Sequence, residues 1–166
     1  MIGFKARALV WVTFFASVLV PAGCLPTPLG IKAISVPLAL AFLYAVGTAG
    51  KYLKWYGGMR SPRDKVKRLV REGPYSCMRH PMHFSQALFM IFLGLSLSWC
   101  SFIVSLIIAL LIIIMAIKLD EKEATEMFGK EYLDYSSKVP PVSLKPSCLL
   151  KLFLRKRVRS SSEPSP

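Results

Sequence analysis

The stretch of sequence that decides the fold is FSQALFMIFLGLSLSWCSFIVSLIIALLIIIMAI, residues 84–117. These 34 residues contain no charged side chain. A helix needs about 20 apolar residues to cross about 30 Å of hydrocarbon, so the stretch is too long for one span and long enough for two short ones. Serines near its middle place a turn at residues 96–101. We therefore predict a helical hairpin with spans at about 82–97 and 100–118.

Two further uncharged runs, residues 8–25 and 33–50, precede the hairpin, and each has about the length of one span. Of the 166 residues, 54% are hydrophobic and 19% are charged, which exceeds the apolar share of soluble domains. We predict an all-α integral membrane protein with four transmembrane helices. Lys5 and Arg7 also fit a signal peptide, but the apolar core is long and no small-residue cleavage site follows it.

The positive charge is unevenly distributed among the predicted loops. Of the 22 Lys and Arg residues, only Lys32 lies between the first two spans, and none lies at 96–101. The positive-inside rule then places the N- and C-termini and the 51–83 loop in the cytoplasm. We attribute the net charge of +13 to this orientation and to anionic lipid headgroups, and expect no nucleic-acid partner.

The four cysteines are Cys24, Cys77, Cys100 and Cys148. They form no CxxC pair and have no metal-ligand spacing, so we interpret them mostly as apolar packing residues and expect no metal site. Cys24 and Cys100 fall on the same extracytoplasmic side, which leaves a disulfide between them open.

Residues 51–72 are basic and are predicted to be a cytoplasmic connector, followed by a turn at Gly73-Pro74 and by a helix whose first turn contains Pro81. Over 118–135 we predict a helix that emerges from the membrane and continues into the cytoplasm. Residues 1–145 then form a single membrane domain, and 146–166 form a basic interfacial tail that ends in disorder.

Within the helix predicted over 118–135, three aromatic residues recur at helical spacing, namely Phe128, Tyr132 and Tyr135. They are therefore expected to pack on one face. The segment Val139-Pro140-Pro141 is predicted to end that helix.

Two blocks of residues carry a family resemblance. They are Gly73-Pro74-Tyr75 with Arg79-His80-Pro81-Met82-His83, and Asp120-Glu121 with Met127-Phe128-Gly129-Lys130-Glu131-Tyr132-Leu133-Asp134-Tyr135 and Val139-Pro140. In this order they resemble the isoprenylcysteine carboxyl methyltransferase and phospholipid methyltransferase group of membrane enzymes. The resemblance covers about residues 67–140. It implies S-adenosylmethionine as cofactor and methyl transfer at the cytoplasmic membrane face to an amphiphilic, lipid-borne or prenylated acceptor.

The resemblance also implies which residues bind the cofactor. They are Lys67, Arg68, Leu69, Val70, Tyr75, His80, Pro81, Met82, His83, Asp120 and Glu121. Structural roles remain open for some of them: His80 as a helix cap, Tyr75 as an interfacial aromatic anchor, and the acidic pair as a solvated helix face.

The chain departs from the family pattern at several positions. His83 stands where an aromatic hydroxyl is usual, Ser85 replaces a glycine, and Asp120 replaces the first of two glutamates. Ala116 occupies the position where the prenylcysteine enzymes have an arginine for the substrate carboxylate, which puts carboxyl methylation of a prenylated protein in doubt. Lys118 would replace that arginine only in a different helix register.

We predict His83 and Arg79 as candidate catalytic residues. A near-neutral imidazole at His83 can accept a proton from an amine or thiol nucleophile. Arg79 is equally explained as one more positive-inside residue.

Two alternative functions follow from the same sequence. One is an NADPH-dependent membrane reductase of the steroid-reductase type, which carries a similar Arg-His-Pro segment. The other is a non-catalytic scaffold whose basic loop and tail bind anionic lipid.

Overall fold

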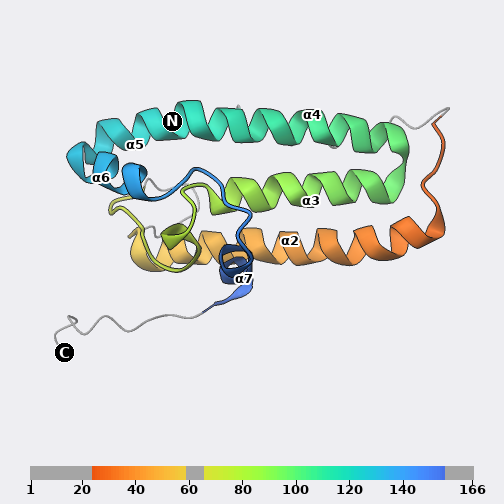
Figure 1. The fold of residues 1–166 in the computed structure, drawn as a ribbon, viewed down its shortest axis with the longest axis horizontal. Helices are drawn as coiled ribbons and strands as arrows, with labels where there is room; N and C mark the ends of the chain where they lie inside the picture. Colours follow the sequence, from red (N-terminus) through yellow and green to blue (C-terminus); the bar gives the residue numbers. More distant parts are fainter. Residues whose placement is uncertain (1–23, 59–65, 156–166) are drawn as a thin grey trace.

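The structure is a computed structural model, and it describes residues 24–58 and 66–155. Three helices, α2 (Leu29–Tyr56), α3 (Pro81–Leu97) and α4 (Trp99–Met115), lie side by side along their lengths, with α3 packed against both of its neighbours (Figure 1). No strand forms within the described residues, where the only β-type pairing is an isolated bridge between Pro26 and Ser98. The predicted all-α class is confirmed for this part of the chain.

The hairpin between α3 and α4 forms where the sequence predicts it. Its turn is at Ser98, whose side-chain oxygen accepts a hydrogen bond from the Ser101 amide at 3.2 Å and caps the start of α4. Near the turn the two helices approach closely, because a Cβ added at Gly94 would collide with the Ser105 side chain. A small residue is therefore required there for the helices to pack.

Within residues 24–58 and 66–155, two helices are long and apolar enough to cross a membrane: Leu29–Tyr56, with a mean hydropathy of 1.9, and the continuous helical stretch Trp99–Phe128, with 3.1. In their most apolar windows only 17% and 33% of the residues are buried inside the protein. The outward-facing apolar side chains of α2 and α4 are Leu29, Ile34, Val36, Leu38, Leu40, Leu43, Ile103, Leu106, Ile107, Leu110, Leu111 and Ile114. Such large exposed apolar faces match a lipid surrounding and indicate membrane association.

Four spans remain a prediction. The helix α3 is apolar but has 17 residues, and the first predicted span, 8–25, falls outside the described residues except for Cys24 and Leu25, which are not helical.

The second predicted span, 33–50, is part of a longer helix. Helix α2 starts at Leu29 and continues through Lys51 and Lys54 to Tyr56, so the predicted connector does not begin at residue 51. The lysines mark where the apolar surface ends. They do not end the helix, because no Gly or Pro occurs between Lys51 and Gly57.

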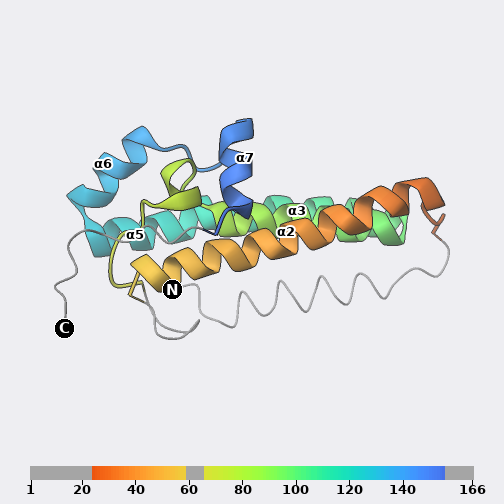
Figure 2. The same cartoon turned by 90° about the horizontal axis from the view of Figure 1, so that it is seen from below.

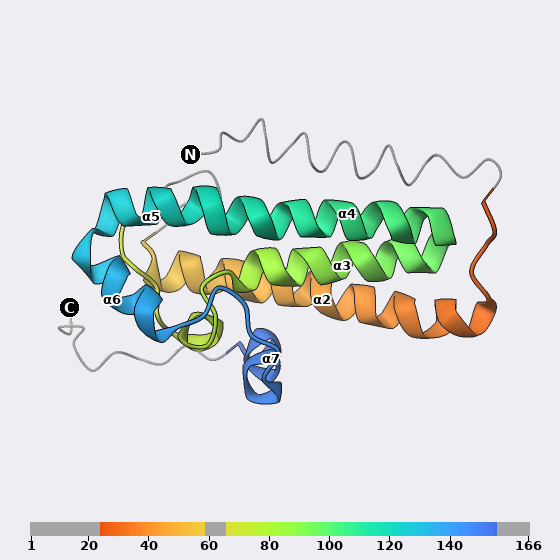
Figure 3. The same ribbon diagram turned by 45° about the horizontal axis from the view of Figure 1, so that its top comes forward.

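The predicted single helix over 118–135 is wrong in its continuity. Helix α4 runs on through a π-helical turn, η2 (Ala116–Asp120), into α5 (Glu121–Phe128), and the chain then breaks at Gly129. Gly129 has φ +51°, a conformation that favours glycine, and α6 (Lys130–Lys138) starts in a new direction beyond it (Figure 3). As predicted, α6 ends just before Val139-Pro140.

The last described helix, α7 (Pro146–Phe153), packs against α2 and against the short turn η1 (Gly73–Ser76). Its Cys148 and Leu152 are buried in a core cluster with Ala45, Met78 and Phe84. Figure 2 shows α6 and α7 on the same side of the three long helices. Part of the segment predicted to be an interfacial tail therefore packs on the body of the protein. The predicted disorder at its end concerns residues outside the described part.

Two disulfides join distant segments. Cys24 pairs with Cys100 at a Cα–Cα distance of 6.0 Å, which is the pairing that the sequence left open. Cys77 pairs with Cys148 at 5.5 Å, so the interpretation of these two as apolar packing residues is corrected. The 71 residues that separate Cys77 from Cys148 conceal their proximity in the sequence.

Candidate functional site

The site is built where the η1 turn leads into α3. Gly73 starts the turn with φ +59°, and the Tyr52 ring of α2 lies where a Cβ of residue 73 would stand. The turn confirms the prediction made from Gly73-Pro74. After it, the amides of Arg79 and His80 donate to the carbonyls of Pro140 and Pro141 at 3.0 and 3.1 Å. These bonds join the two sequence blocks directly and hold Arg79 and His80 at the start of α3.

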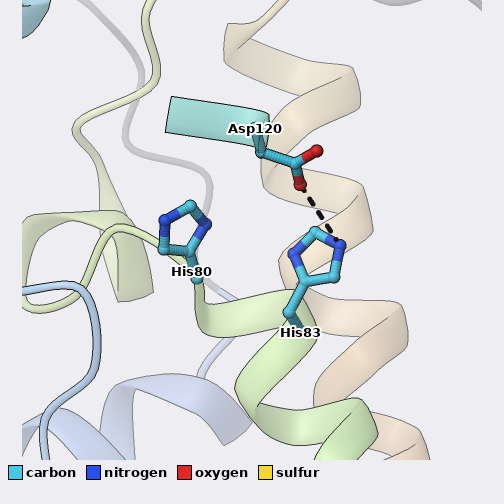
Figure 4. Close-up of side chains that lie close together, drawn as sticks. All are labelled: His80, His83 and Asp120. Carbon is cyan, nitrogen blue, oxygen red and sulfur yellow. Dashed lines mark ion pairs between the residues drawn. The ribbon is translucent and has the colours of Figure 1, made fainter. Parts of the chain in front are cut away.

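Five polar side chains meet at this end of the helices, and we call them the site cluster: Arg79, His80, His83, Asp120 and Glu121. Glu121 Oε1 lies 2.9 Å from His80 Nε2 and 3.1 Å from Arg79 Nη2. His83 Nε2 lies 3.4 Å from Asp120 Oδ2, and Figure 4 shows His80, His83 and Asp120 converging. All five were predicted site residues, and the fold brings them together from segments about 40 positions apart.

The site cluster is largely shielded from solvent. The side chains of Arg79 and Glu121 are 11% and 19% exposed, and His80 is buried. Arg79 Nε is buried and has no hydrogen-bond partner among the described residues. A buried N–H without a partner costs about 1–3 kcal/mol, more for a charged group, and it therefore marks a place where a ligand acceptor would be stabilised.

Tyr75 contributes to the site through its backbone. Its ring is buried beside Val70 and Tyr52, while its carbonyl accepts a hydrogen bond from the Tyr135 hydroxyl at 2.6 Å. Burial raises the pKa of the Tyr75 and Tyr135 phenols above their ordinary value. Burial, and next the Glu121 carboxylate, raise the pKa of Tyr132 to about 12. These phenols are neutral packing groups, which agrees with the packing role predicted for Tyr132 and Tyr135.

We expect Tyr135→Phe to destabilise the fold by about 1–2 kcal/mol, because it removes the hydrogen bond that joins α6 to the η1 turn and leaves a buried carbonyl unsatisfied. Thermal unfolding in detergent measures the effect. Tyr44→Phe is the control: Tyr44 is exposed on α2, and its ring is kept, so a change below about 0.5 kcal/mol is expected. Equal effects of both changes would contradict the assigned bond.

The other predicted cofactor residues lie around the cluster. The amides of Lys67 and Arg68 donate to the carbonyl of Gly57, and their side chains are exposed. Leu69 is half-buried, as is Met82, which packs on the aromatic cluster of Tyr52 and Tyr75. Pro81 is fully buried at the first turn of α3. For these residues the structure gives a position, and their contact with a cofactor stays a prediction.

Two contributions to the site were not recognised in the sequence. The carbonyls of Pro140 and Pro141 hold the Arg79-His80 segment, whereas the sequence indicates only a helix end and a family motif at these prolines. The spacing of His80 and His83, three residues apart at a helix start, places both imidazoles on one face, and this spacing was the available signal for their joint role.

Ala116 and Lys118 bear on the substrate. Ala116 is buried on η2, and Lys118 is exposed. Lys118 therefore lies on a different face from the buried Ala116, and its replacement of the family's arginine stays a prediction.

The site cluster is thus a shielded set of paired charges at the end of long apolar helices, and those helices indicate a membrane-associated protein. In a comparison with protein families, residues 28–131 match the family described as phospholipid methyltransferase. This match covers more than half of the chain, and the chain belongs to that family. Membership implies a membrane methyltransferase. Searches of curated proteins and of solved structures give no match.

Proposed function

We propose that the protein transfers a methyl group from S-adenosylmethionine to a lipid-borne or prenylated amphiphilic acceptor at the cytoplasmic face of the membrane. The observation that carries the proposal is the site cluster, in which Glu121 pairs with both Arg79 and His80 at the end of the apolar helices. Family membership supports the methyl transfer, and the exposed apolar faces of α2 and α4 support a lipid-borne acceptor.

The charges of the site cluster fit the amino-acid end of this cofactor. An ammonium group is matched by the carboxylates of Asp120 and Glu121, as predicted from the acidic pair. A carboxylate is matched by Arg79, whose buried Nε lacks a partner among the described residues. We therefore assign the ammonium to Asp120 and Glu121, and the carboxylate to Arg79. His80 to His83, Tyr75 and the 67–70 segment remain proposed for its other parts.

Bound S-adenosylmethionine supplies a methyl group on a sulfonium, and the good leaving group is the neutral thioether that remains after transfer. The protein's own residues need only bind, align the acceptor and exclude water. His83 is proposed to take a proton from an amine or thiol acceptor. Because Asp120 lies 3.4 Å from His83 Nε2, it orients this ring and stabilises its protonated form.

The acceptor is proposed to enter sideways from the bilayer with its chain in the lipid. Ala116 is small and buried, so it offers no cation for an acceptor carboxylate, which favours an amine or thiol. The basic residues of the connector and tail are proposed to contact anionic headgroups and to keep both termini in the cytoplasm.

We expect His83→Phe to lower turnover of an amine acceptor at saturating S-adenosylmethionine by roughly 10²–10⁴-fold, the usual contribution of a general base. Turnover of the wild type should rise with pH as the imidazole loses its proton, and the variant should lack this rise. The measurement is turnover at saturating cofactor across pH. Unchanged turnover at all pH values would remove the base role.

Calorimetry with purified protein tests the proposal as a whole. We expect S-adenosylmethionine to release heat and to protect against thermal unfolding, and NADPH to do neither. Binding of NADPH alone would favour the reductase alternative. The scaffold alternative is favoured if removal of residues 156–166, which leaves α7 and its disulfide in place, weakens membrane association while changes at His80 and Glu121 have no effect.

A further inference from the structure

His80, His83 and Asp120 form a group that meets the basic requirement of a metal site. One ligand atom from each lies within 4.8 Å of the other two. Around an ion with bonds of about 2.0–2.1 Å, tetrahedral ligand atoms stand about 3.3 Å apart. His83 Nε2 and Asp120 Oδ2 already have a separation of 3.4 Å. A rotation of the His80 side chain that moves its ligand nitrogen by about an ångström would complete the set.

The second ring nitrogen of His80 is prepared for coordination. Its Nε2 lies 2.9 Å from Glu121 Oε1. An ionised carboxylate only accepts, so the proton of the ring lies on Nε2 and the lone pair lies on Nδ1. Figure 4 shows that the other ring nitrogen of His80 lies on the side facing His83 and Asp120. A carboxylate that accepts the distal N–H of a ligating histidine is the usual second-shell arrangement of metal sites.

The charge of the site cluster also suits a cation. Arg79 contributes one positive charge, Asp120 and Glu121 contribute two negative charges, and the imidazoles are neutral when they coordinate. Arg79 is paired with Glu121 at 3.1 Å, and Asp120 Oδ2 lies 3.4 Å from His83 Nε2, so the Asp120 carboxylate is placed beside a second ligand of the proposed ion.

We propose that His80, His83 and Asp120 bind a divalent transition-metal ion of the Zn²⁺ or Co²⁺ type, with Glu121 supporting His80. Two imidazoles and one carboxylate select this class over Mg²⁺ and Ca²⁺, which prefer all-oxygen ligands. Three protein ligands leave one position for water or an exogenous ligand. The cysteine pattern predicts no metal site. The ligands meet only because α4 returns the chain to the start of α3.

A consequence rests on the proposed function. The metal would take the Asp120 carboxylate and the His83 ring that are proposed to serve the cofactor and the acceptor. Bound metal therefore excludes productive cofactor binding, and the enzyme is inhibited by Zn²⁺.

The test uses full-length protein in detergent, freed of metal with a chelator and then titrated with Co²⁺ alone. We expect binding of one ion per chain with the visible absorption of low-coordinate Co²⁺. His83→Asn and Asp120→Asn should each weaken binding by more than about 100-fold, since even second-shell changes cost about 10–100-fold. Glu121→Gln should weaken Co²⁺ binding by about 10–100-fold, because Glu121 accepts the Nε2–H of His80 and so holds that ligand in place. The control is Glu126→Gln, an exposed acidic residue of α5, and should have no effect.

Absence of Co²⁺ binding, or equal binding by the wild type and the Asp120→Asn variant, overturns the metal site. Melting temperatures of the variants check that they are folded. If the His83→Asn variant is unfolded, the Asp120→Asn variant alone tests the metal site. S-adenosylmethionine binding in chelator is measured in parallel. Cofactor binding without Co²⁺ binding overturns the metal site and leaves the proposed function standing. Co²⁺ binding without cofactor binding supports the metal site and counts against the proposed function. If both bind without competition, the predicted inhibition is wrong.

Discussion

Glu121→Gln should weaken the binding of S-adenosylmethionine by about 30-fold or more. Glu121 pairs with Arg79 and His80 through one oxygen and is proposed to meet the cofactor ammonium. Truncating one partner of a buried charge pair costs about 2–5 kcal/mol, and 1.4 kcal/mol corresponds to tenfold in affinity. Because the side chain keeps its size, the loss reports on charge.

The measurement is calorimetric titration in detergent, with Glu126→Gln as the control. Glu126 lies on the same helix, α5, and is exposed. Its neutralisation removes the same single negative charge from α5 without changing the site cluster. The variant also leaves Arg79 unpaired, so its melting temperature must be recorded alongside. Affinity within about twofold of wild type, for a folded Glu121→Gln protein, would remove Glu121 from the cofactor site.

Gly73→Ala should destabilise the protein by about 2–5 kcal/mol. Gly73 has φ +59°, which costs an L-residue about 1–2 kcal/mol, and its new Cβ would collide with the Tyr52 ring, an overpacking that costs about 1–3 kcal/mol. The ring cannot move freely, because its hydroxyl donates to the Leu154 carbonyl at 3.2 Å. The change therefore displaces the turn that positions Arg79 and His80.

Thermal unfolding in detergent measures this effect, and two further variants separate its causes. Gly129→Ala meets φ +51° and ψ −126°, a conformation that favours glycine, with nothing within 4 Å of the added Cβ, so it should cost only a conformational part, about 1–3 kcal/mol. In the Tyr52→Leu background, Gly73→Ala should lose most of its collision cost. An undiminished cost of Gly73→Ala in that background would show that the contact with Tyr52 does not matter.

Much of the fold was predictable because the charge pattern along the chain is so uneven. The uncharged stretch 84–117 forms the predicted hairpin with its turn inside 96–101, and Pro81 begins α3 as expected. Helix ends were less predictable. The end of apolar surface at Lys51 was taken for the end of α2, and Gly129 was not recognised as a break, since single glycines are tolerated in helices and only the backbone conformation reveals the turn.

The candidate site was predictable in its members and not in its contacts. Arg79, His80, His83, Asp120 and Glu121 were all chosen from motif resemblance. The sequence does not show that Glu121 pairs with both Arg79 and His80, or that Asp120 faces His83. These contacts depend on the rotation of α5 relative to the start of α3. The same holds for the Cys77–Cys148 disulfide.

The sequence by itself determined the helical class, the hairpin and the residue types of the site, because apolar run length, turn residues and charge placement are local properties. Only the tertiary structure decided which carboxylate pairs with which base, which carbonyls hold the Arg79-His80 segment, and that two imidazoles and one carboxylate lie close enough to share an ion. Those are distances of a few ångströms between segments about 40 to 60 residues apart, and they are set by packing of α3 against α4 and by the break at Gly129.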